Sequence, residues 1–260
     1  MRKKIFMVIV VGFLVLSVAA VSKLLAAKSS NAGQAANPDK PGRPEKLEQI
    51  IFVHPMAPDK PAKPDKPPGK PPKDEKPIDN TYYELWGGYL ADNAQYYVNP
   101  DIGLVTAGDP VAAVNAAADA WDVVTAANVF NYAGTTEKNW YELDGQNTIS
   151  WVKFIPRDNI AVAVMWYDPS TMIIYEFDIV FNTFHRWGID PVPDDKDKIK
   201  AFDIQNIATH EFGHPTGLSD LYDDLYRELT MYGYSAKGET GKRTLEEGDI
   251  VGARELHGSP

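Results

Sequence analysis

The sequence contains no cysteine among its 260 residues. This absence excludes disulfide bonds, a thiolate nucleophile, thiolate metal ligands and any lipid anchor attached to cysteine. Histidine is also scarce, with five residues in the chain. Any metal site must therefore be built from these few imidazoles together with carboxylates.

Basic residues are scarce after residue 78. Residues 1–78 hold 14 Lys and Arg against 7 Asp and Glu, a charge of +7, whereas residues 79–260 hold 12 against 29, a charge of −17. Such an acidic segment repels phosphate backbones and anionic lipid. We therefore expect no nucleic-acid binding and no attachment of this segment to a membrane surface.

The chain has one long apolar run, and it lies at the N-terminus. Residues 2–4, which follow Met1, are all basic, and Ile5 to Val21 are apolar apart from a glycine and a serine. A basic start followed by an apolar run is typical of an export signal, and 17 residues are close to the minimum for spanning a bilayer. We predict that residues 1–27 are a signal peptide or an N-terminal membrane anchor, and that the protein is extracellular, either secreted or held at the cell surface.

Residues 28–78 are rich in Pro and Lys and contain few apolar side chains. This composition predicts a disordered linker or a pro-segment that precedes a domain at 79–260. One apolar island, Ile50 to Val53, interrupts it and fits either a strand of the domain or part of a removable pro-segment. His54 beside the island fits a latency device that caps a metal, or an incidental exposed histidine, which is the commoner case.

The domain alternates strand-like and helical patterns. Apolar spacing and capping residues predict helices over Pro110 to Ala127, from about Asp203, and from a capping box at Thr244 and Glu247 to Gly258. Between the first two helices, β-rich runs cover Thr148 to Ile155, Ile160 to Tyr167 and Met172 to Phe181. We expect an α+β fold with a small, twisted mixed sheet and about three helices.

The segment that carries the chemistry begins His210-Glu211-Phe212-Gly213-His214. Residues four apart lie on the same face of a helix, so both imidazoles can reach one ion. Glu211 then lies beside the ion, where it can act as the general base that takes a proton from a metal-activated water.

A third ligand is predicted six residues after His214. Gly217 can adopt a positive φ and end the helix, which turns the chain so that Asp220 points back at the ion. A carboxylate oxygen is an acceptable zinc ligand, although most aspartates are caps or solvated. A distant glutamate, Glu228 or Glu239, is the alternative third ligand.

The complete pattern H-E-x-x-H-x-x-G-x-x-D, followed by Leu229-Thr230-Met231-Tyr232, resembles the metzincin metallopeptidases. It is most similar to the matrixins, with the aspartate third ligand of the snapalysin group. The segments Phe177 to Asn182 and Leu245 to Gly252 also resemble the strand before the active-site helix and the closing helix of matrixins. The resemblance covers most of residues 82–258 and is strongest at the metal motif.

The resemblance implies one catalytic zinc on His210, His214 and Asp220, Glu211 as catalytic base and Met231 as a support beneath the histidines. It implies a monomeric zinc endopeptidase that acts on extended peptides or unfolded proteins docked along Ile160 to Tyr167. The cysteine latency switch of matrixins is impossible in this chain, so any latency must work differently.

Two further expectations accompany this assignment. The acidic runs around residues 194–197 and at Asp223 and Asp224 fit calcium binding, but solvated loops are the commoner explanation. The alternative function is a catalytically inactive surface binding module on a metallopeptidase fold. Zinc binding without cleavage of unfolded protein would favour that alternative.

Overall fold

The computed structural model describes residues 44, 46–58, 78–102, 108–190 and 201–260. The predicted signal or anchor, most of the predicted linker and the acidic run at 194–197 lie outside these residues. Within the described part, no helix is both long enough and apolar enough to cross a bilayer.

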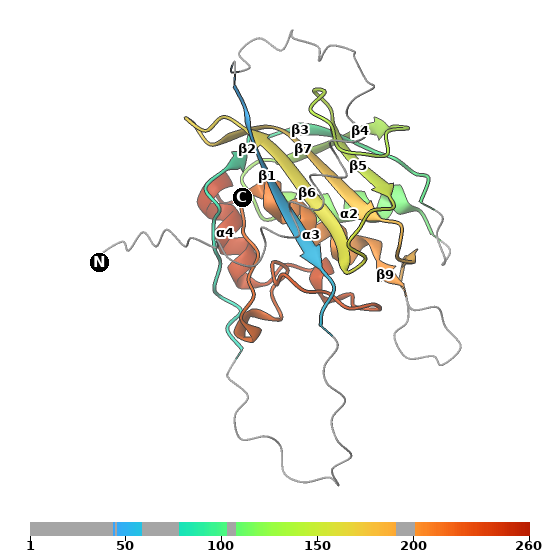
Figure 1. The fold of residues 1–260 in the computed structure, drawn as a ribbon. Helices are drawn as coiled ribbons and strands as arrows, with labels where there is room; N and C mark the ends of the chain where they lie inside the picture. Colours follow the sequence, from blue (N-terminus) through green and yellow to red (C-terminus); the bar gives the residue numbers. More distant parts are fainter. Residues whose placement is uncertain (1–43, 45, 59–77, 103–107, 191–200) are drawn as a thin grey trace, which may run out of the picture. The chain divides into compact units, whose positions relative to one another are not determined.

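A mixed sheet of seven strands forms one layer of the fold (Figure 1). Six strands follow the order β1-β6-β7-β5-β3-β4, and the short β2 pairs with one end of β7. Strand β6 pairs antiparallel with β1 on one side and with β7 on the other, whereas β7, β5, β3 and β4 pair in parallel. The strand bounds are β1 Glu48–Pro55, β2 Tyr89–Leu90, β3 Ala94–Val98, β4 Phe130–Thr135, β5 Asn147–Val152, β6 Asn159–Tyr167 and β7 Ile173–Asn182.

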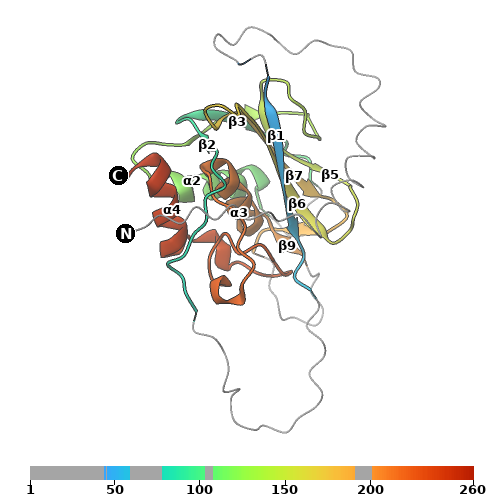
Figure 2. The same ribbon diagram turned by 60° about the vertical axis from the view of Figure 1, so that its left-hand side comes forward.

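Three α-helices in the described residues, α2 Pro110–Asp122, α3 Ile204–Thr216 and α4 Glu247–His257, lie on one side of this sheet (Figure 2). A second, two-stranded sheet of β8 Trp187–Gly188 and β9 Phe202–Asp203 leads into α3. The main core fills the space between the large sheet and the helices. Its largest side chains include Trp121, Phe177 and Phe212, all fully buried, so α3 is embedded in the core.

The structure is a mixed α/β arrangement with a mixed sheet and three helices, as expected, but its sheet is larger than the three predicted strands. Helix α2 ends at Asp122, five residues before the predicted end. The Asp122 carboxylate accepts hydrogen bonds from the backbone amides of Val129 and Phe130, which fixes the chain after it leaves the helix.

The predicted capping box of α4 was wrong by two residues. The box is formed by Glu246 and Asp249, not by Thr244 and Glu247. Asp249 is buried and also accepts hydrogen bonds from the backbone amides of Thr230 and Met231, far from α4 in the sequence, so a tertiary contact selected this capping residue.

Strand β1 changes the predicted organisation of the chain. Glu48–Pro55 was predicted to belong to the linker, with its apolar island open to a strand interpretation, and it forms the outer strand of the main sheet (Figures 1 and 2). Strand β6 was predicted to be a free edge for peptide docking, but β1 covers it along its full length.

Candidate metal centre

Helix α3 carries three of the predicted site residues in a buried setting. Its N-cap, Asp203, accepts a hydrogen bond from the Asn206 amide. Two tryptophans from other parts of the chain donate hydrogen bonds to carbonyls of this helix. Trp121 Nε1 donates to the Thr209 carbonyl and Trp86 Nε1 to the His214 carbonyl, each at 2.8 Å. These contacts fix the rotation and position of the helix that presents the metal motif.

Gly217 ends α3 in the left-handed conformation, with φ of 116°. A Cβ added there would lie 2.2 Å from Leu256 Cδ1, so both conformation and space require glycine. The helix continues through Pro215 to Thr216, and the proline is tolerated in its last turn. The chain then reverses and brings Asp220 back towards the helix.

The two imidazoles are held in one tautomer by backbone carbonyls. His210 Nδ1 lies 2.7 Å from the Thr230 oxygen, and His214 Nδ1 lies 3.0 Å from the Leu218 oxygen. Because a carbonyl only accepts hydrogen bonds, each Nδ1 carries a proton, and in the neutral form of each ring the lone pair is therefore on Nε2. Both Nε2 atoms face Asp220 Oδ1, at 3.0 Å from His210 and 3.8 Å from His214.

This arrangement fits a cation better than a set of hydrogen bonds. Within the described part of the chain, His210 Nε2 and Asp220 Oδ1 are buried without a hydrogen-bond partner, although they lie close together. Ligands about 2.1 Å from a tetrahedral zinc lie about 3.4 Å from one another, between the two observed separations. His210, His214 and Asp220 therefore form a buried group that could hold a metal ion.

The protonation states also suit metal binding. Burial lowers the pKa of His214 to about 4, so its imidazole is neutral at physiological pH. Burial would raise the pKa of Asp220, but the neighbouring His214 and His210 hold it below the ordinary value. The site thus presents neutral imidazole and an ionised carboxylate, the forms in which these side chains ligate metals.

Tyr222, which carries no signal in the sequence, orients the carboxylate of Asp220. Its hydroxyl donates to Asp220 Oδ2 at 3.1 Å, which leaves Oδ1 to face the imidazoles. The alternative third ligands do not join the group. Glu239 accepts from the Ala236 amide, and Glu228 pairs with Arg227 at the surface.

Glu211 is fully buried beside the three ligands. Its Oε2 has no hydrogen-bond partner among the described residues. Its Oε1 lies 3.0 Å from His54 Nδ1, and His54 Nε2 lies 3.1 Å from Ser235 Oγ. His54 is only 1% exposed, so it is not the incidental surface histidine that was the commoner expectation.

Met231 packs directly against α3 at Gly213, the residue before His214. A Cβ added at Gly213 would lie 2.2 Å from Met231 Sδ, so glycine makes room for the sulfur. The turn that contains Met231 is held by Asp249, which accepts from the amides of Thr230 and Met231. Since Thr230 also supplies the carbonyl that orients His210, Asp249 helps to position His210 through the backbone.

Lys242 is a second buried charged residue near this turn that sequence reasoning missed. Burial lowers its pKa to about 8, and its ammonium donates to the Tyr232 carbonyl. Neither Lys242 nor Asp249 carries a signal in the sequence, because each looks like an ordinary charged residue in a loop or on a helix face.

We expect Asp249→Ala to destabilise the fold and loosen the metal centre together. Three backbone amides, those of Thr230, Met231 and Glu246, would lose their acceptor. Buried donors left without partners cost about 1–3 kcal/mol each, so the free energy of unfolding should fall by roughly 2–4 kcal/mol after partial relaxation. Urea unfolding measures the loss, and Glu247→Gln, an exposed change on the same helix, should leave the midpoint unchanged.

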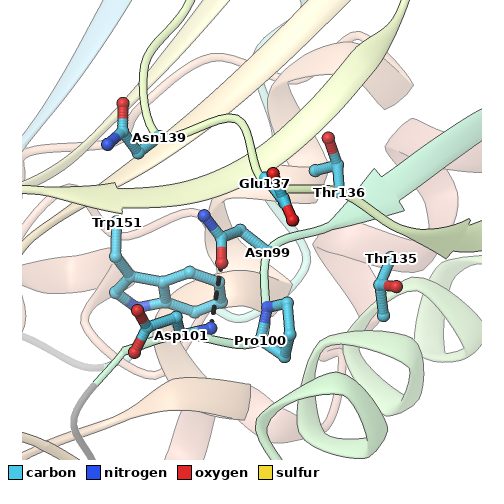
Figure 3. A pocket seen from close by; sticks show the side chains of 8 residues that line it. All are labelled: Asn99, Pro100, Asp101, Thr135, Thr136, Glu137, Asn139 and Trp151. Carbon is cyan, nitrogen blue, oxygen red and sulfur yellow. Dashed lines mark hydrogen bonds between the residues drawn. The ribbon is translucent and has the colours of Figure 1, made fainter.

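A separate hollow of about 850 Å³ lies beside the ends of β3 and β4 (Figure 3). Its lining is polar and includes Asn99, Asp101 and Glu137 around the edge of Trp151. The Asn99 amide bridges the Asp101 backbone and the Lys138 carbonyl, so its polar groups serve the local loops. It contains no imidazole, and we assign no chemistry to it.

Any functional conclusion for this chain must come from its own residues, because the comparisons with known proteins found no match. No family model matches the chain, and no curated protein matches it.

Proposed function

We propose that this protein is a zinc-dependent endopeptidase of the metzincin type, matrixin-like, with an aspartate as its third metal ligand. One observation carries the proposal. Two buried ligand atoms with no hydrogen-bond partner among the described residues, His210 Nε2 and Asp220 Oδ1, converge with His214 beside an equally unpartnered oxygen of Glu211. Buried polar atoms are costly unless a partner satisfies them, so a bound cation explains why these two ligand atoms are tolerated together.

The chemistry follows from the positions of the side chains. A zinc ion held here would supply a Lewis acid that acidifies water and polarises a peptide carbonyl. Glu211 Oε2 would take a proton from the attacking water as the oxygen adds to the carbonyl carbon. Glu211 would then pass that proton to the leaving amine nitrogen as the C–N bond breaks.

The proposed substrates are extended peptides or unfolded proteins, and the proposed location is outside the cell. Strand β6 would offer main-chain hydrogen bonds to an extended chain once β1 has left it, because β1 pairs with β6 along its full length. The basic and apolar residues at the N-terminus support export, with the protein either released or anchored by that segment.

Metal removal tests the proposal. The purified full chain should contain one zinc per molecule by elemental analysis. A chelator should remove this zinc and abolish any cleavage of unfolded casein, and added zinc should restore both. Absence of bound zinc at saturating concentration would contradict the proposal, whatever the activity.

A second candidate is a binding module without catalysis, and the contact between His54 and Glu211 favours it. A permanently covered base would leave a metal-bound but inactive protein. Zinc binding without hydrolysis, even after β1 has been displaced, would select this second function.

A further inference from the structure

Strand β1 and the residues after it cross the metal centre as a continuous extended segment. The strand pairs antiparallel with β6 from Glu48, opposite Tyr167, to Pro55, opposite Asn159. Met56 then forms a parallel bridge with Ser235, and the Ala57 amide donates to the Ser235 carbonyl at 2.9 Å. The segment is thus held by main-chain bonds on both sides of the site.

Two side chains of this segment lie on the metal centre itself. The ring of Phe52 stacks on His214, with centroids 4.1 Å apart and planes 12° apart. The ring of His54 lies 4.0 Å from that of His210 and contacts the Glu211 carboxylate. Glu211 therefore has a hydrogen-bond partner at the oxygen that faces β1.

The bonding pattern is that of a bound peptide rather than of an ordinary edge strand. An edge strand added to a sheet pairs with one neighbour, whereas this segment leaves β6 and continues onto the loop that follows Met231. Peptides that add to a sheet edge bind through such main-chain bonds, whatever their side chains are. An external peptide that used β6 and Ser235 would have to take the same path.

We propose that residues 48–57 are an intramolecular inhibitor, which occupies the path of the substrate peptide and engages the general base through His54. This inference rests on the proposed endopeptidase function and adds its regulation. The segment must leave before a substrate can bind. A short tether gives such a segment an effective concentration of about a millimolar at its own site. Once the chain is cut after the segment, its concentration is only that of the protein, in the micromolar range, and it competes much more weakly with a substrate.

The test uses the full chain with a recognition site for a sequence-specific protease placed within residues 62–70, outside the described residues. A labelled peptide with the sequence of residues 46–58 serves as the probe, and its binding is followed by fluorescence polarisation. All binding measurements are made with a chelator present, so they do not depend on hydrolysis and the Glu211 carboxylate that His54 contacts is kept. After cutting and dilution, the probe should bind at least tenfold more tightly than it binds the uncut chain.

Probe variants locate the contacts. Phe52→Ala and His54→Ala in the probe should each weaken its binding, whereas Gln49→Ala, at an exposed position, should not. Equal probe binding before and after cutting would overturn the proposal. So would a cut N-terminal fragment that stays bound on dilution to nanomolar concentration, since the strand would then be a permanent part of the fold.

A second measurement uses the uncut chain with Phe52→Ala and His54→Ala combined. Amides of β6 should exchange hydrogen at least tenfold faster, while those of α3 stay protected. Faster exchange in both elements would show that β1 is structural and would contradict the inference. If only the endopeptidase proposal is wrong, the probe and exchange measurements would still give the expected results, but the cut chain would bind no zinc or cleave no protein.

Discussion

Glu211→Gln is expected to lower the rate of peptide hydrolysis by about 10²–10⁴-fold, the usual contribution of a general base. The substitution keeps the size of the side chain and removes only its capacity to accept and return a proton. Glu211 lies outside the group of His210, His214 and Asp220, so zinc held by that group should remain, whereas an ion held by the other candidate group, His54, His210 and Glu211, would lose a ligand. The rate of casein hydrolysis should be measured after the chain is cut within residues 62–70, so that β1 can leave, and the zinc content should be measured in the same samples.

The matched control is Glu247→Gln, the same chemical change at an exposed position on α4. It should leave both the rate and the zinc content unchanged. If Glu211→Gln retained full hydrolysis, another group would have to be the base. If it lost zinc in proportion to activity, Glu211 would act as a ligand and not as a base.

Asp220→Ala is expected to have the largest effect on metal affinity, a weakening of at least about 100-fold. Changes to residues that only orient ligands typically cost 10–100-fold, so loss of a ligand should cost no less. The substitution also leaves the facing Nε2 atoms of His210 and His214 without their nearest carboxylate, at 3.0 and 3.8 Å. Competition with a zinc-binding dye measures the affinity.

Two glutamates provide the comparison. Glu228→Ala and Glu239→Ala remove the carboxylates that the sequence left open as third ligands, and neither lies in the metal-binding group. Both variants should bind zinc as tightly as the unaltered chain. An equal loss in Asp220→Ala and in one of these variants would mean that the ligand set changes when the ion binds.

The closing helix shows where local rules stop. Thr244 and Glu247 satisfy the capping-box spacing, but Glu246 and Asp249 form the box. The reason is that Asp249 is buried, where it accepts hydrogen bonds from the amides of Thr230 and Met231. The spacing of residues in the sequence identifies possible capping residues, whereas the buried hydrogen-bond partners decide which of these residues caps the helix. Helix α2 similarly ends early because Asp122 bonds to the start of β4.

The sequence by itself determined the local geometry of the candidate metal centre. The spacing of His210 and His214 on a helix, the turn at Gly217 and the return of Asp220 all depend on short stretches of backbone, and short-range rules describe them. The tertiary structure alone decided that His54 reaches Glu211, 157 residues away, and that β1 covers β6. Such contacts depend on long-range strand pairing and on which polar groups are buried, and neither leaves a periodic signal in the sequence.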